Sequence, residues 1–154
     1  MRRRADPGFV LLAVALAGIA FSVSCAAEED FQTTTAAAPE GRDAGVVAYY
    51  FHGNLRCKTC RTIEAYSEEA IRSGFADELG SGRLAWRVVN VEEPENKHFV
   101  EDFALVTRSL VLAEYEDGEV TRWENLNQVW QLVQEKKRFL EYVRRSTREF
   151  LRED

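Results

Sequence analysis

The stretch Val46–Tyr66, VVAYYFHGNLRCKTCRTIEAY, decides the fold of this chain. Its first eight residues, Val46–Gly53, are apolar, β-branched or aromatic and lack the alternation of a half-exposed strand, so they predict a buried central strand. After a short break, apolar residues recur at helical spacing over about 58–79. Cys57 and Cys60 therefore fall where a helix begins after a buried strand.

The rest of the sequence supplies further strands and helices around this unit. A helix between two strands favours a parallel crossover, and an Asp-Gly turn requires an antiparallel pair. The expected fold class is therefore α/β, with a central mixed four-stranded sheet and three flanking helices in the order βαβαββα. The expected elements are a strand over Leu84–Glu93, a short helix opened by Pro94, two apolar strands joined at Asp117-Gly118 within Ser109–Leu126, and a long helix from Asn127 to about Leu151.

The first 25 residues predict an export signal. Arg2–Arg4 supply a positive start, and Phe9–Ser24 supply an uncharged apolar run that is shorter than the roughly 18 residues of a membrane span. The sequence SVSC ending at Cys25 resembles a lipoprotein box, which makes Cys25 a candidate for lipidation. Cleavage by an ordinary signal peptidase, which would remove Cys25 with the signal, stays open as an alternative.

The predicted domain organisation follows from this signal. Residues 26–45 are small, polar and aperiodic, which predicts a flexible tether, and 46–154 form the folded domain. We expect an extracytoplasmic location, with attachment to a membrane if Cys25 carries a lipid; a disulfide can persist there. The formal charge of -6 and the lack of a basic patch outside the N-terminus argue against a nucleic-acid partner.

The CKTC motif at a helix start, after an apolar strand and within this order of elements, resembles the thioredoxin-like superfamily over about Val46 to Leu151. Only a thiolate attacks a disulfide, and the N-terminus of a helix favours the anion at the first cysteine. We therefore expect Cys57 to be the nucleophile. Cys60 lies one turn later on the same face, where it can close a disulfide and release a partner.

Five neighbours are candidates for tuning the thiolate. Arg56, Lys58 and Arg61 flank the cysteines, although each could be a solvated side chain, and His52 could move a proton or simply pack at the end of its strand. Thioredoxins usually carry Trp before the first cysteine, Gly-Pro between the two, and a cis-proline that faces the disulfide before the third strand. Here Arg108 or a neighbour stands in the place of that proline, either as a fixed cation or as an exposed arginine.

A narrower resemblance rests on YYFHGNLRCKTCRTIEAY, on SLVL and on WENLNQVWQLVQEKKRFLEYVRR. These segments are similar to the exported ArsF-type subunit family of nitrophenyl compound nitroreductase. The resemblance implies an accessory electron-carrying subunit of a nitroaromatic or arsenical reductase system, with a membrane-associated protein as its redox partner. It implies no cofactor other than the redox-active disulfide between Cys57 and Cys60.

Two other classes of function stay open beside a thiol–disulfide oxidoreductase, so the sequence does not decide whether the chain is an enzyme. The vicinal dithiol could bind a soft metal or arsenite, although two sulfurs are too few for a closed zinc site and His52 is the only nearby additional ligand. No metal site is therefore expected. Alternatively, the disulfide could staple the loop in a structural docking subunit of a membrane complex.

Overall fold

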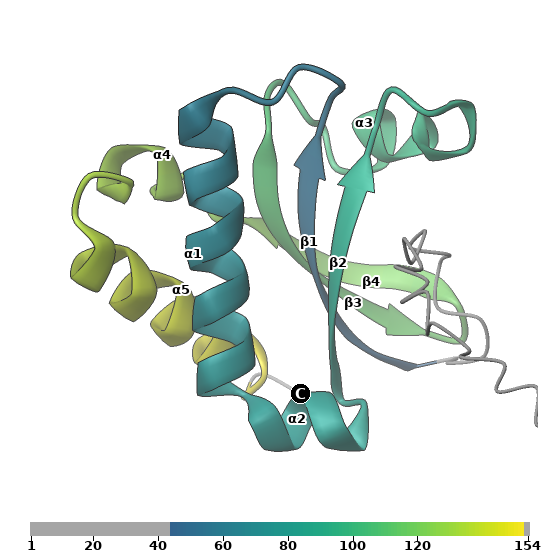
Figure 1. The fold of residues 1–154 in the computed structure, drawn as a ribbon. Coiled ribbons are helices and arrows are strands. Elements are labelled where there is room, and N and C mark those ends of the chain that lie inside the picture. Colours follow the sequence, from purple (N-terminus) through teal and green to yellow (C-terminus); the bar gives the residue numbers. More distant parts are fainter. Residues whose placement is uncertain (1–43, 153–154) are drawn as a thin grey trace, which may run out of the picture. The chain divides into compact units, whose positions relative to one another are not determined.

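The computed structural model describes residues 44–152, which belong to one compact unit (Figure 1). The predicted export signal, the lipidation candidate Cys25 and nearly all of the predicted tether lie outside the described residues. The first strand, β1 (Ala44–His52), begins slightly before the predicted start at Val46.

The four strands form one mixed sheet in the order β2-β1-β3-β4. β1 pairs in parallel with β2 (Leu84–Asn90) and antiparallel with β3 (Ser109–Glu116), which pairs antiparallel with β4 (Glu119–Asn125). β1 is therefore a central strand, as its continuous apolar run predicts. The α/β class, the mixed four-stranded sheet and the thioredoxin-like arrangement are confirmed.

The helices are more broken than the sequence predicts. The expected helix over 58–79 is two helices, α1 (Lys58–Gly74) and α2 (Ala76–Ser81), because buried Phe75 leaves the helical conformation with φ -143°. The short helix after β2 consists of the 3-10 turn η1 (Pro94–Asn96) and α3 (His98–Asp102). The expected C-terminal helix is likewise divided, into α4 (Val129–Leu132) and α5 (Lys136–Phe150).

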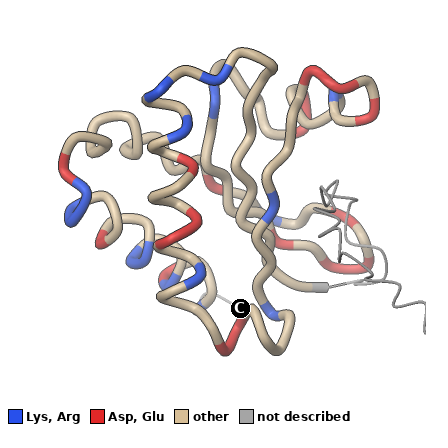
Figure 2. The backbone as a smooth tube through the Cα atoms, in the orientation of Figure 1, with Lys and Arg blue, Asp and Glu red and all other residues tan. Residues whose placement is uncertain are grey.

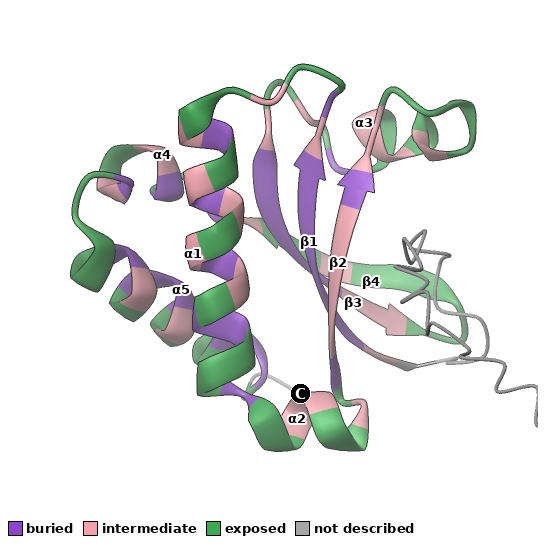
Figure 3. Cartoon of the chain, viewed as in Figure 1, coloured by how far each residue is buried: buried purple, intermediate pink, exposed green. Residues whose placement is uncertain are grey.

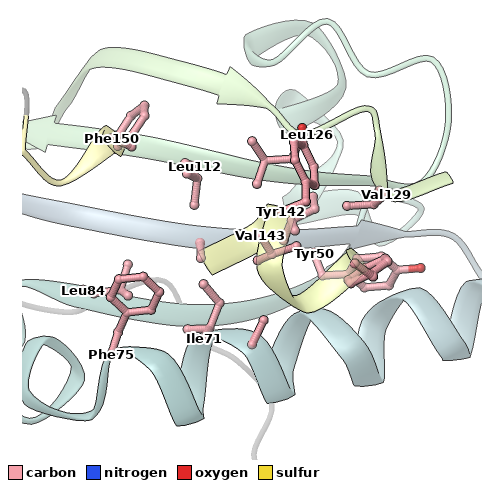
Figure 4. Close-up of a cluster of buried hydrophobic side chains, with 14 of the residues drawn as sticks. Tyr50, Ile71, Phe75, Leu84, Leu112, Leu126, Val129, Tyr142, Val143 and Phe150 are labelled. Carbon is pink, nitrogen blue, oxygen red and sulfur yellow. The ribbon is translucent and has the colours of Figure 1, made fainter. Parts of the chain in front are cut away.

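One face of the sheet is covered by α1 and α5 (Figure 1). Alternate residues of β1, among them Val46 and Tyr50, point to this face and are buried with side chains of both helices. Figure 4 shows this cluster, with Ile71 of α1, Val143 of α5 and Leu112 of β3 among its members. Most of the buried apolar side chains lie here, so this layer supplies the larger part of the hydrophobic stabilisation.

The opposite face carries a smaller cluster of aliphatic and aromatic side chains beneath α3. Tyr49 and Phe51 of β1 contact Phe99 and Phe103, with ring centroids 5.3–5.9 Å apart. β4 is an edge strand that is largely exposed, so the prediction of two apolar hairpin strands is right for β3 and wrong for β4. The hairpin turn itself is confirmed, because Asp117 and Gly118 both adopt positive φ, of 51° and 80°.

Candidate functional site

The two cysteines lie at the N-terminal end of α1 and are joined by a disulfide, with their Cα atoms 5.2 Å apart. Cys57 is the N-cap residue, in an extended conformation, and it is exposed to solvent. Cys60 lies in the first turn and is only 2% exposed. Cys57 is therefore the more accessible of the two cysteines.

The start of α1 provides a favourable electrostatic environment for a sulfur anion at Cys57. The backbone N–H of Cys60 donates a hydrogen bond to Cys57 Sγ at 3.2 Å, as an N-cap side chain accepts from the first turn. No acidic residue lies in that first turn. The helix dipole and this N–H group therefore act on the sulfur without an opposing carboxylate in the same turn.

Tyr50 of β1 donates a hydrogen bond to the first turn of α1. No role at the site was expected for it from the sequence. Its side chain is fully buried, and its hydroxyl donates a hydrogen bond of 2.7 Å to the carbonyl oxygen of Cys60. Burial raises the pKa of Tyr50 to about 12, against the smaller opposing effect of Arg56 and Arg108, so the hydroxyl keeps its proton. The sequence signal is only that Tyr50 falls on the helix-facing side of β1, which also holds plain core residues.

The three flanking cations differ in their surroundings. Arg56 forms an ion pair with Glu64 one turn along α1, and both side chains are partly buried. Lys58 and Arg61 are exposed and form no ion pair within residues 44–152. The charge of Arg56 is thus offset by a carboxylate, whereas Lys58 and Arg61 keep theirs beside Cys57.

Arg108 joins two loops beside the disulfide. The end of β1 pairs with the start of β3, with Phe51 opposite Ser109, which brings the residue before β3 next to the cysteine loop. Arg108 Nη2 donates a hydrogen bond of 2.8 Å to the carbonyl of Leu55, and Trp130 Nε1 donates one of 3.0 Å to the Arg108 carbonyl. The role of Trp130 in holding this backbone was not foreseen from the sequence.

Leu55 and Val106, on the two loops that Arg108 joins, are large apolar residues that are 79% and 96% exposed. Exposed apolar side chains of this kind are suited to contact with a partner protein. Nothing in the sequence distinguishes them from other surface residues. Their position becomes apparent only when the pairing of β1 with β3 is known.

His52 ends β1 and is half-buried. Its Nδ1 donates a hydrogen bond of 2.9 Å to the carbonyl of Gly53. Desolvation by burial, assisted by the charges of Arg56 and Arg108, lowers the pKa of His52 below 6.5, although the Gly53 carbonyl and Glu93 oppose this shift. With Arg108, His52 also lines a cavity of about 190 Å³ behind the cysteine loop. The imidazole is therefore neutral at pH 7, and its place agrees with the simpler expectation of a packed residue with one hydrogen bond.

Residues 44–152 contain no cluster of three or more His, Cys, Asp or Glu side chains that could hold a metal ion. In the same part of the chain, none of the helices has both the length and the apolar character needed to cross a lipid bilayer.

Comparisons with known proteins add little to this geometry. No family model matches the chain, and no curated protein matches its sequence. Among solved structures, one described as "Structure of a malarial protein" is similar with a TM-score of 0.34 and 12% identity, over 60% of this chain and 97% of the other. A likeness at that level carries no argument about fold or function. What stands is a CxxC disulfide at a helix N-terminus in an α/β fold, which is compatible with a redox role.

Proposed function

We propose that this chain is an extracytoplasmic thiol–disulfide oxidoreductase or electron-carrying subunit that works through Cys57 and Cys60. One observation carries the proposal: Cys57 is exposed at the start of α1, its sulfur caps the helix and accepts the Cys60 N–H, and Cys60 is buried. A disulfide that served only as a staple would have no need of one accessible sulfur at the positive end of a helix dipole.

The proposed reaction transfers two electrons between two dithiol–disulfide pairs. The Cys57 thiolate attacks one sulfur of a partner disulfide, forms a mixed disulfide and releases the second partner sulfur as a thiolate, which takes up a proton. Cys60 then loses its proton and attacks Cys57 Sγ, so that the mixed disulfide breaks and the partner leaves as a dithiol. A thiol reductant regenerates the Cys57–Cys60 dithiol, and the sequence runs in reverse when the chain acts as an oxidant.

The wider setting follows from the sequence resemblance. In this setting, the chain is an accessory subunit of a nitroaromatic or arsenical reductase system. A lipid on Cys25 holds it near a membrane, where it faces a membrane-associated redox partner. Support for this setting comes from the quoted sequence segments and from the predicted export signal, which lies outside the described residues.

The test uses the folded chain from about Asp43 onward, since the described residues form one compact unit. We expect Cys57 to react with a thiol alkylating agent well below pH 8 and the pair to equilibrate with a glutathione or dithiothreitol buffer. A reduction potential near or below about -270 mV indicates a reductant, and one near about -120 mV an oxidant. Cys57→Ser should abolish exchange, whereas Cys60→Ser should accumulate a mixed disulfide on Cys57.

A buried Cys60 and an exposed Cys57 make these two variants matched controls for one another. If alkylation requires ordinary thiol conditions and neither cysteine exchanges with the buffer, the proposal is wrong. Stoichiometric arsenite or soft metal retained by the reduced protein, and lost in Cys60→Ser, would favour the binding hypothesis. Unchanged function in Cys57→Ser together with a lowered melting temperature would favour the structural one.

A further inference from the structure

The charge around Cys57 is opposite in sign to the net charge of the whole chain. The formal charge of the chain is -6, yet four cations surround the cysteines, and within residues 44–152 Glu64 is the one acid that forms an ion pair with any of them. Figure 2 shows Lys and Arg gathered around the start of α1, and Asp and Glu along the segment between β2 and α3. The cations are Arg56, Lys58, Arg61 and Arg108.

These cations are not spread evenly about the sulfur. Lys58 and Arg61 lie on the outer side of α1. On the opposite side, the loop after β2 carries Glu92 and Glu93: Glu92 lies against Gly53, and Glu93 acts on the charge of His52. The side toward α1 is therefore basic, whereas the side toward β2 carries charges of both signs, because Glu92 and Arg108 line the same cavity there.

Two depressions hollow the basic side. One, of about 450 Å³, is lined by Lys58, Arg61, Thr62 and Tyr66 among others, and the second, of about 320 Å³, shares Lys58, Thr62 and Tyr66 with it and continues to Val133. No acidic side chain lines either of them. Together they form what we call the α1 groove, which offers cations, hydroxyl groups and apolar surface to an extended peptide.

We propose that the redox partner presents an acidic segment next to its reacting cysteine, and that this segment lies in the α1 groove against Lys58 and Arg61. This inference rests on the proposed function, because it concerns the mixed disulfide between Cys57 and the partner. Arg56, which is offset by Glu64, contributes less. Charge complementarity favours an acidic segment on the side toward α1, because the α1 groove has cations and no acidic side chain among its lining residues.

The experiment compares three disulfide-linked peptides of equal length whose cysteine is flanked by Glu, by Gln or by Lys. The reduced protein reacts with each at low ionic strength, and the second-order rate is followed by quenching and mass. We expect the Glu peptide to react on the order of tenfold faster than the Lys peptide, and this preference to shrink in 0.5 M salt, where charges are screened. The double variant Lys58→Glu/Arg61→Glu should lose or reverse the preference.

The ratio of the Glu to the Lys rate is the decisive quantity, because any effect of the substitutions on Cys57 itself cancels within each variant. The matched control is Arg145→Glu/Arg152→Glu, which changes the net charge equally at two exposed positions, one in α5 and one just after its end. That end of α5 lies by Phe75, beyond the far end of α1 from Cys57, where Arg148 stacks over the Phe75 ring. This control should keep most of the preference.

The outcomes separate this inference from the function on which it rests. A Glu-to-Lys rate ratio near one in the unmodified protein, or an equal loss of the preference in both double variants, overturns the proposed role of the α1 groove. Exchange with the Gln peptide in the same experiment still supports the oxidoreductase function. Failure to react with any of the three peptides overturns both. A preference for Glu that disappears only in Lys58→Glu/Arg61→Glu supports the inference.

Discussion

The two ends of α1 are built in different ways. Its C-terminal half packs Ala70 and Ile71 against the sheet, and Phe75 follows as a buried residue, so this part belongs to the main core. Its N-terminal end begins at exposed Cys57, after a loop that is mostly exposed (Figure 3), although Cys60 and Ile63 in the first two turns are buried. The packed layer therefore holds the helix, and Cys57 lies at its exposed start, linked to that layer through buried Cys60 and Tyr50.

Phe139 tests the packed layer, and substitutions here should have the largest effect on stability. It is 0% exposed in α5, and its ring meets Tyr66 of α1 edge-on with centroids 5.5 Å apart. Phe139→Ala should lower the free energy of unfolding by about 3–5 kcal/mol, because it removes buried surface and leaves a cavity. Urea unfolding of the oxidised protein measures this change. The rate of thiol–disulfide exchange with a neutral disulfide is then measured on the folded fraction of the variant.

The neighbouring Lys137→Ala is the control, since its side chain is 90% exposed and the change should cost less than about 0.5 kcal/mol. If Phe139→Ala slows exchange in the folded protein by more than about tenfold, roughly 1.4 kcal/mol of coupling, the separation between core and site does not hold. A loss of stability below about 1 kcal/mol would show that α5 is not part of the core as described.

Tyr50 connects the two regions and gives an intermediate effect. Its ring belongs to the main core and its hydroxyl bonds the Cys60 carbonyl. Tyr50→Phe should lower the free energy of unfolding by about 1 kcal/mol, the usual net value of one hydrogen bond, and should speed hydrogen exchange of amides in the first turn of α1. Tyr66→Phe is the matched control, because its hydroxyl makes no hydrogen bond within residues 44–152 and its loss should be nearly neutral. Equal amide exchange in the two variants would refute the role of Tyr50 at the site.

The sequence predicts the sheet better than it predicts the helices. The uninterrupted apolar run of β1 and the Asp117-Gly118 turn specify a central strand and a hairpin, because each has few alternative structures. The breaks at Phe75 and before Lys136 leave no such mark, since apolar spacing continues through both. Tertiary packing decides there: Phe75 leaves the helix and is buried in the main core.

The site was predictable as far as it is local in the sequence. The position of Cys57 at the start of the helix follows from the motif, whereas the burial of Cys60 was not expected from the sequence. The contacts of Arg108 with Leu55 and of Tyr50 with Cys60 depend on strand pairing and on which face of β1 meets the helices. The ion pair between Arg56 and Glu64 depends on side-chain positions that the sequence does not give. It offsets the charge of Arg56, which the sequence suggests as a free cation.

His52, at the end of β1, gives the smallest expected effect, which is a change of stability with pH. Because burial holds its pKa below 6.5 in the folded state, the unfolded chain binds the proton more readily as the pH falls. The contribution of His52 to stability is therefore present above about pH 7.5, declines through the unfolded pKa near 6.5, and is fully lost below the folded pKa. Unfolding of the oxidised protein and of His52→Gln between pH 8 and pH 5 isolates the effect of His52, because the two proteins differ only at this residue. The difference in free energy should shrink toward acid. A constant difference would mean that Glu93 and the Gly53 carbonyl balance desolvation, and a difference that grows toward acid would mean that they outweigh it; either result contradicts a lowered pKa of His52.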